Sequence, residues 1–293
     1  MKHFLFLSVG SFFLLASCRR DNIPEDRITG NSRMSAYTIY DSSNAGTALI
    51  RRKGTVEYDA HGRPTLHTIY DPSQSGALAI GLRVRYYYAL PVDSVAERTE
   101  SENSSGILHT RYEWNGSLLL RDTGFLTNSA FAGPRANTYT YQGNEAYRYT
   151  AGYTDMGTVN RETVHYVQSW QGDDLMQHTD TLVRDLGNGT GYQRTSITAT
   201  YLPEANPFFV LVRPVFRKVA TILDPSALNW EFAQRHLVSS RSYTIGVWGA
   251  WQGGTDTYDF SYSYLFDAQG RVTRMIEEAP SLAHRYVIVF EYQ

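Results

Sequence analysis

A strict two-residue alternation near the C-terminus constrains the fold more than any other feature of this sequence. Tyr258, Phe260, Tyr262, Tyr264 and Phe266 occupy every second position, and mostly polar residues lie between them. Side chains with a period of two lie on one face of a β-strand, whereas a helix would distribute the same positions around its axis. The segment is therefore predicted to be a strand with one aromatic face and one polar face.

This strand is followed by a turn sequence that also occurs near the start of the chain. Residues 267–271 read DAQGR and residues 59–63 read DAHGR, each preceded by an aromatic residue and followed by a threonine two positions later. An Asp side chain accepts hydrogen bonds from backbone amides two residues on, and Gly adopts the left-handed conformation of tight turns. Both segments are predicted to be β-hairpins.

Weaker copies of the hairpin pattern occur between these two. An aromatic residue, a polar amide and a glycine stand together at residues 114–116, 141–143 and 170–172. Their glycines lie 27 and 29 residues apart, which suits two strands and two turns per unit, with one turn of each unit on the same edge of the sheet. The chain is therefore predicted to be all-β. We expect a single antiparallel meander over residues 36–293 that forms a strongly curved sheet or a partly closed barrel.

Residues 201–237 interrupt the alternation with four prolines and then a helical pattern. Asp224 and Pro225 are typical of a helix N-cap and of the first helical position. We expect one short helix near 225–237. It would act as a cap over an apolar edge of the sheet or, alternatively, as a plug or lid over one mouth of a barrel.

The N-terminus has the features of an export signal. Lys2 precedes an apolar run that is too short for a permanent transmembrane helix and fits a signal peptide over residues 1–17. The run ends in Leu-Ala-Ser-Cys, which matches the lipobox of bacterial lipoproteins, and Cys18 is the only cysteine in the chain. We expect a lipid on Cys18 that anchors the protein to a membrane, and a flexible, mostly polar tether over residues 18–35. An ordinary secretory signal with a bystander cysteine is the alternative.

The lipobox, the aromatic-Asp-x-x-Gly-Arg hairpins and the Asn206-Pro207-Phe208 segment together resemble a family of Bacteroidota lipoproteins. The domain of that family is described as porin-like in fold and has no established activity, and the resemblance covers roughly residues 36–293. It implies a cell-envelope location as an outer-membrane lipoprotein, on the periplasmic face or at the cell surface. The hairpins alone also resemble the YD repeats of Rhs-type toxin shells, where such repeats are more numerous.

Composition and motifs exclude several function classes. A formal net charge of −2 does not provide the basic face that nucleic acids require. The eight histidines show no metal-ligand spacing, and the chain has no Gly-x-Ser-x-Gly elbow and no phosphate-binding glycine loop, so we expect no metal and no cofactor. His67, His109, His165 and His178 lie in alternating segments, and we interpret them as polar sites on a solvated sheet face.

Two function classes stay open. The first is a non-enzymatic binding or carrier module of unknown ligand in the cell envelope; the second is a glycan-active hydrolase with unidentified carboxylates. Acidic neighbours such as Glu277-Glu278 and Asp173-Asp174 would point to opposite faces of a strand and cannot easily act as a catalytic pair. The non-enzymatic class is therefore favoured, and no catalytic residue is assigned.

Trp248 and Trp251 are the candidate ligand-binding residues, because four glycines surround them within residues 245–259. Indole faces on a loop too rich in glycine to bury them could hold a polysaccharide or an apolar envelope molecule. Alternatively, both rings fold back over the end of the sheet as anchors of an irregular turn. Trp114 and Trp170, each just before a hairpin glycine, would extend the binding surface if their turns shared its edge.

Replacing Cys18 with serine should remove the lipid anchor, because the diacylglycerol is attached through the thiol. We expect Cys18→Ser protein to leave the detergent-rich phase of a cell-envelope extract and to accumulate as a larger precursor. The measurement is detergent phase partitioning followed by immunoblotting. A variant that stays in the detergent phase with an unchanged precursor-to-mature ratio would show that Cys18 is not the anchor.

Overall fold

The computed structural model describes residues 33–293 except 44–47, 74, 91–94, 116–117, 128–134, 143–144, 156–157, 173, 186–189, 213, 215–233 and 250–252. Strands dominate this part of the chain. They are β1 Met34–Asp41, β2 Leu49–Tyr58, β3 Pro64–Pro72, β4 Leu78–Tyr87, β5 Arg98–Asn103, β6 Gly106–Asn115, β7 Leu118–Thr127, β8 Arg135–Gln142, β9 Glu145–Asp155, β10 Thr158–Gln171, β11 Asp174–Asp185, β12 Thr190–Ala205, β13 His236–Gly249, β14 Gly254–Phe266, β15 Val272–Ala279 and β16 His284–Tyr292. A four-residue helix, α1, covers Phe209–Val212, and a 3-10 helix covers Pro280–Leu282.

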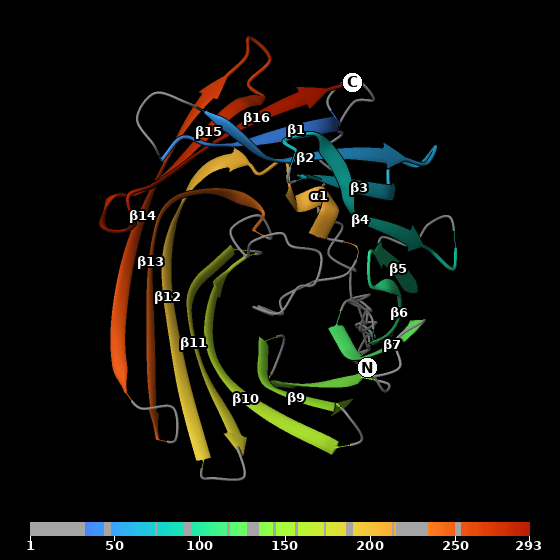
Figure 1. Cartoon of the computed structure of the whole chain (residues 1–293), viewed down its shortest axis with the longest axis vertical. Coiled ribbons are helices and arrows are strands. Elements are labelled where there is room, and N and C mark those ends of the chain that lie inside the picture. The colour runs from blue at the N-terminus through green and yellow to red at the C-terminus, as the bar shows by residue number, and fades with distance from the viewer. Residues whose placement is uncertain are drawn as a thin grey trace, which may run out of the picture.

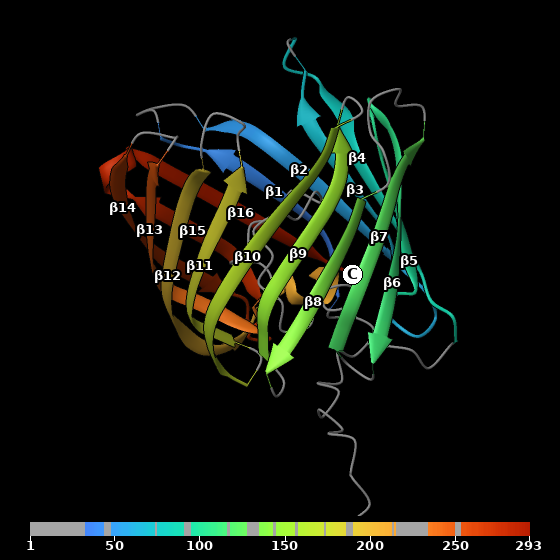
Figure 2. The same cartoon turned by 90° about the horizontal axis from the view of Figure 1, so that it is seen from below.

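The strands form one antiparallel meander that closes into a barrel. Each strand pairs with its neighbours in sequence, and β1 pairs with both β2 and β16. Ile39 of β1, for example, stands between Arg52 of β2 and Ile288 of β16. Figures 1 and 2 show the ring of strands with α1 inside it. The predicted all-β meander is confirmed.

Because neighbouring strands run in opposite directions, successive connections lie at alternate ends of the barrel. We call the base the end at which β1 begins, and the rim the opposite end, where β1 connects to β2 and β13 connects to β14. The connections after β2, β6, β8, β10 and β14 all lie at the base. These are the five hairpins that carry the aromatic-and-glycine pattern, so the predicted placement of one turn per unit on a common edge is confirmed.

The two best copies of the hairpin pattern have the same hydrogen bonds. Asp59 Oδ1 accepts from the backbone amides of His61 and Arg63, both at 2.9 Å, and Asp59 Oδ2 accepts from Arg63 Nε at 2.7 Å. Asp267 repeats these three contacts at 2.9, 2.9 and 2.7 Å with the turn of β14 and β15. The glycines of the two turns have φ of +78° and +77°, a conformation that side chains with a Cβ rarely adopt. The repeated sequence therefore specifies one turn structure twice.

Aromatic side chains at the base tie most hairpins together. A strand that runs toward the base brings a Tyr or Trp to its end, and this side chain donates a hydrogen bond to a carbonyl where the preceding strand starts. The pairs are Tyr58 to Met34, Tyr88 to Pro64, Tyr141 to Leu119, Tyr201 to Leu175, Tyr264 to Val238 and Tyr292 to Val272, at 2.6–3.0 Å, together with Trp114 Nε1 to Ala96 at 2.9 Å. We call the six tyrosines the basal tyrosines. Burial raises the pKa of Tyr58, Tyr88, Tyr141, Tyr201 and Tyr292, so these phenols stay protonated and remain donors near neutral pH.

The inner face of the barrel carries the core. Tyr37 of β1 is fully buried and packs edge-on against Phe208, just before α1, with ring centroids 4.9 Å apart. Because directly paired residues share a face, the register then assigns the inner positions of the other strands. The largest cluster of buried residues joins β1, β2 and β12–β16 to α1, and smaller clusters lie on β3 and β4 with Ala96, and on β7 and β8. The outer positions are mostly Ser, Thr, Arg and Glu.

The helix expected near 225–237 is only partly testable. Residues 225–233 lie outside the described part of the chain. Gln234 and Arg235 form a bend, and β13 begins at His236, so the last four predicted positions are not helical. The described helix, α1, stands earlier in the same proline-rich insertion and packs inside the barrel. Its neighbours Phe208 and Leu211 are buried in the main core.

Gly54 provides a sharp test of inner-face packing. It stands opposite Tyr37, and a Cβ at this position would lie 2.1 Å from Tyr37 Cε1. Gly54→Ala should lower the free energy of unfolding by about 1–3 kcal/mol, because the buried ring cannot move aside. Gly254→Ala, in β14 with nothing within 4 Å of the added carbon, is the matched control and should change little. Equal stability of the two variants in urea unfolding would contradict the described packing.

Candidate functional site

Polar side chains cluster on the inner face of β11–β16, where most of a core would be apolar. His178 Nε2 contacts Asp180 Oδ2 at 2.9 Å, and both side chains are almost fully buried. Glu277 and His284 form a second contact, with Nε2 of the histidine 2.7 Å from Oε1 of the carboxylate. Arg241, between these pairs on β13, is also buried. We call these five residues the inner polar cluster.

The environment of Glu277 explains how a carboxylate is tolerated there. Burial alone would raise its pKa, but the hydrogen bond from His284 and the charge of Arg241 lower the pKa below its ordinary value. The guanidinium of Arg241 also lies 3.9 Å above the ring of Phe260. A buried charge that is paired and hydrogen-bonded in this way is a stable part of the wall.

Half-buried aromatic side chains adjoin this cluster. Tyr243 and Tyr258 are paired across β13 and β14, and their rings stack with centroids 6.3 Å apart. Burial, and the nearby charge of Asp180, raise the pKa of Tyr243. The partial exposure of both tyrosines shows that solvent reaches this part of the inner wall.

The interpretation of the strand histidines as solvated is wrong for His67 and His178. Both lie on the inner face, with 0% and 1% of their surface exposed. Burial, with the nearby charge of Arg52, lowers the pKa of His67 to about 3, so this ring is neutral. Its Nε2 lies 3.0 Å from the hydroxyl of Tyr37. His109 does lie on the outer face, and the side chain of His165 is outside the described part of the structure.

Five of the inward carboxylates have partners among the described residues. Each is held by basic or hydrogen-bonding groups: Asp71 by Arg52, Asp122 by Asn137 and Tyr139, Asp174 by His236, Asp180 by His178, and Glu277 by His284. The adjacent acids Glu277 and Glu278 point to opposite faces, as the sequence predicts, with 4% and 46% of their side chains exposed. Within the described residues no group of His, Cys, Asp or Glu could hold a metal ion.

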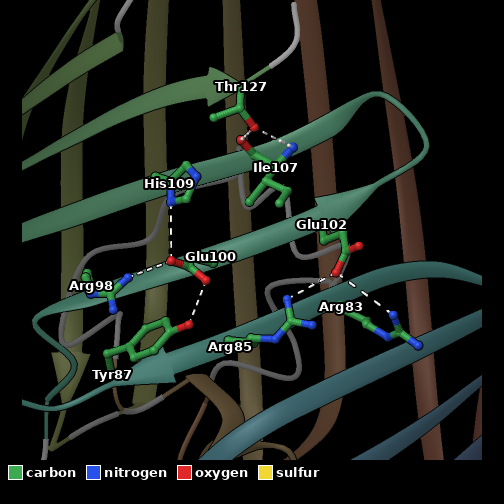
Figure 3. Close-up of polar contacts among 9 residues, drawn as sticks. All are labelled: Arg83, Arg85, Tyr87, Arg98, Glu100, Glu102, Ile107, His109 and Thr127. Atoms are coloured by element: carbon green, nitrogen blue, oxygen red, sulfur yellow. Dashed lines mark hydrogen bonds and ion pairs between the residues drawn. The ribbon is translucent and has the colours of Figure 1, made fainter.

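The outer face of β4–β6 carries a network of charges, shown in Figure 3. Glu100 accepts a hydrogen bond from Tyr87 at 2.6 Å and from Arg98 at 2.6 Å, and lies 3.3 Å from His109 Nδ1. The hydrogen bond from Tyr87 and the charge of Arg98 lower the pKa of Glu100. Glu102 pairs with Arg85 at 3.1 Å and with Arg83 at 4.0 Å, all three more than one third exposed. This outer wall is ionic and open to solvent.

Trp248 lies on the outer face, in a strand and not on the glycine-rich loop that was expected. It pairs with Tyr192 of β12, and the two rings are parallel within 5° with centroids 5.9 Å apart. The glycines have a different role from the one predicted: Gly246 gives the indole room along β13, and Gly249 accommodates Tyr192. Trp248 is 41% exposed.

The other tryptophans do not join Trp248. Trp114 and Trp170 lie at the ends of β6 and β10, at the base, whereas Trp248 lies near the rim. Both are partly buried, and their N–H groups donate to Ala96 O and Gln168 Oε1, each at 2.9 Å. Trp251 and Cys18 lie outside the described residues. The four-tryptophan surface suggested by hairpin spacing is therefore not assembled.

Sequence reasoning missed the residues that the closed ring brings together. Tyr192, the partner of Trp248, stands in an ordinary alternating segment, and the inner polar cluster combines four strands from 178 to 284. The local signal was the polarity of His178, Asp180 and Arg241, whose neighbours in the sequence are also polar. The alternation shows two faces but does not show which of them is the interior.

Comparison with protein families and with curated proteins finds no match for the sequence. Several solved structures have a similar fold, among them two porin-like proteins. A porin-like protein from Bacteroides vulgatus matches with a TM-score of 0.52 and 12% identity, over 89% of this chain and 98% of its own. A porin-like protein from Bacteroides uniformis matches with a TM-score of 0.50 and 12% identity, over 90% and 98%. At this identity the likeness concerns the fold, and it agrees with the porin-like family that the sequence resembles. Among the described helices, none has the length and hydropathy of a membrane span.

The lowered pKa of Glu277 gives a pH prediction. The folded state favours its carboxylate, so this stabilisation is present above the unfolded pKa of about 4.3 and is lost as pH falls through the lower folded value. Glu277→Gln should be less stable than the parent by about 1–3 kcal/mol at neutral pH, and the difference should shrink below about pH 4.

The matched control for this prediction is Glu278→Gln. Glu278 is exposed and paired with Arg285 on the outer face, so its replacement should change stability by less than about 1 kcal/mol. Urea unfolding of the three proteins across the pH range measures both effects. A difference between the parent and Glu277→Gln that stays constant down to about pH 3 would contradict the assignment.

Proposed function

We propose that this protein is a lipid-anchored envelope lipoprotein that acts as a non-enzymatic binding or carrier module. The observation that carries the proposal is the orientation of the barrel wall. Aromatic and apolar side chains form most of the buried inner face around the inner polar cluster, while Arg–Glu networks and hydroxyl side chains cover most of the outer face. Such an outer surface suits a barrel whose wall is in contact with water.

A membrane barrel needs the opposite arrangement. Its outer wall is an apolar band, and an Arg or Lys at the bilayer midplane costs about 2–4 kcal/mol. Arg83, Arg85, Glu100 and Glu102 on adjacent outer positions would together make insertion of this wall strongly unfavourable. The likeness to porin-like proteins therefore supports a shared shape for this chain, and we do not extend it to pore formation.

The proposed anchor is the acylated Cys18, linked to the barrel by the tether that precedes β1. The first described residue, Arg33, is held at the base, where its carbonyl accepts the amide of Gln293 at 3.0 Å. A lipid on Cys18 would place the base toward the outer membrane. The rim, with Trp248, would face away from it.

We propose Trp248 and Trp251 as ligand-contacting residues, with a polysaccharide or an apolar envelope molecule as ligand. Trp248 supports this role because its ring is exposed near the rim. Trp114 and Trp170 support it less, because their rings pack at the base and their N–H groups are already bonded. A hydrolase is disfavoured because the inward carboxylates are held by His, Arg, Asn and Tyr partners.

Two measurements on the detergent-extracted, full-length protein test the proposal. In planar bilayers we expect no single-channel conductance, because the outer wall cannot face lipid. In a thermal-shift screen of soluble glycans and fatty acids, a true ligand should raise Tm as its concentration exceeds Kd, since it binds the folded state alone.

Reproducible conductance steps would contradict the proposal of a binding module and would favour a pore. A screen in which saturating glycans and fatty acids all leave Tm unchanged would also count against it. Accumulation of shorter glycan fragments in the same incubations would favour the hydrolase.

A further inference from the structure

We infer that the outer face of β12 and β13 near the rim binds a neutral glycan chain through the paired rings of Tyr192 and Trp248. The inference rests on the proposed binding function and makes it more specific. It assigns one wall, one aromatic pair and one ligand class, and it includes neither Trp114 nor Trp170.

The geometry of the aromatic pair supports binding of a sugar ring. Tyr192 and Trp248 are directly opposite on neighbouring strands, with parallel rings. A Cβ on Gly246 would lie 3.8 Å from Cζ3 of Trp248, so the indole extends along the strand above this glycine without a side chain beneath it. Pyranose rings present C–H groups on their faces, and these pack well against the electron-rich faces of aromatic rings.

The unused hydrogen-bonding capacity of Trp248 is the second argument. Trp114 and Trp170 donate their indole N–H groups within the protein. Trp248 has no such partner among the described residues, although its ring is held in a defined position. A rigid aromatic ring with an available N–H donor suits a ligand that is apolar on its faces and rich in acceptors at its edges.

The surroundings of the pair are the third argument. The outer positions of β11–β14 are mainly hydroxyl side chains, several of which contact one another across strands. Thr244 and Thr257 lie 3.0 Å apart, and Thr200 lies 2.7 Å from Ser240. Among the paired outer positions of these four strands whose side chains are described, the charged residues are Arg194 and Asp259. Such a surface offers donors and acceptors to hydroxyl groups without attracting ions.

An outer-wall pair elsewhere shows that aromatic stacking alone does not define this site. His109 and Phe125 face one another on β6 and β7 with ring centroids 4.8 Å apart, and Phe125 is 51% exposed. This second pair stands beside the Arg–Glu network of Figure 3. A neutral glycan would have to displace paired charges there, so the two pairs provide a matched comparison.

The test is native electrophoresis of the full-length, detergent-extracted protein in gels that contain a soluble polysaccharide. The neutral probes are β-glucan, α-mannan and dextran, and the anionic probe is polygalacturonate. At least one neutral probe should retard the parent protein more strongly than the anionic probe. Trp248→Ala and Tyr192→Ala should each weaken retardation by about tenfold in Kd, equivalent to about 1.4 kcal/mol. Trp248→Phe should retain most of the binding, and Phe125→Ala should match the parent.

Three outcomes would overturn the inference. One is equal retardation of the parent and Trp248→Ala, and another is a loss of binding in Phe125→Ala as large as in Trp248→Ala. The third is retardation by polygalacturonate alone. Circular dichroism melting of each variant confirms that a loss does not reflect unfolding.

One further variant separates this inference from the proposed function. Tyr258 lies on the inner wall and stacks on Tyr243. If Tyr258→Ala abolishes retardation while Trp248→Ala does not, the ligand lies inside the barrel: the outer-wall site is wrong and the binding module stands. If no polysaccharide is bound but a fatty acid raises Tm, the glycan assignment fails and the carrier function stands.

Discussion

Pairing of β1 with both β2 and β16 is the constraint on which the rest of the structure depends. A closed sheet has no edge strands, so its backbone hydrogen bonds are satisfied around the ring without a partner protein. Closure also creates an inside and an outside. Because side chains alternate along a strand, each residue of the meander is then committed to one of these faces. The aromatic stripe of β14 enters the interior, and most hydroxyl and many charged side chains lie on the outer face.

At the base of the barrel, side-chain hydrogen bonds stabilise this arrangement of the strands. The hydroxyl of each basal tyrosine donates a hydrogen bond to a carbonyl at the start of the neighbouring strand, where the backbone hydrogen bonds between the two strands end. The same bond recurs in six hairpins whose sequences have diverged, and Trp114 supplies the equivalent bond with its N–H group. The repeat unit is therefore a pair of strands closed at the base by one aromatic donor. The Asp-Arg turn joins one such unit to the next and is present in its full form twice, after β2 and after β14.

Much of this architecture could be predicted from the sequence, because it depends on local patterns. The alternation around Tyr262 indicates a strand, and the Asp267 turn indicates the hairpin and its register. Which stripe faces inward could not be predicted, since alternation is symmetric between faces. His67 and His178 were assigned to a solvated face for that reason, but both lie on the inner face and are buried.

The candidate site depends on relations that no local pattern contains. Trp248 and Tyr192 become neighbours only because β12 and β13 pair across a long insertion. Trp114 and Trp170 are separated from Trp248 by the direction of their strands, which requires knowing that each ends at the base. The position of the short helix α1 depends on tertiary packing, because Phe208 and Leu211 fill the interior beside Tyr37.

In the proposed arrangement, the outer wall faces water while the protein is attached to a membrane. This arrangement is tested most directly by a spin label on Thr198→Cys, an exposed position on the outer face of β12. Cys18 is the only native cysteine, so with its thiol acylated the new thiol is the only one to label. In liposomes that carry the lipidated protein, the account predicts frequent collisions of the label with a water-soluble nickel chelate and few with oxygen dissolved in the bilayer. A label protected from nickel and accessible to oxygen would show that the wall is embedded in lipid and would contradict the account.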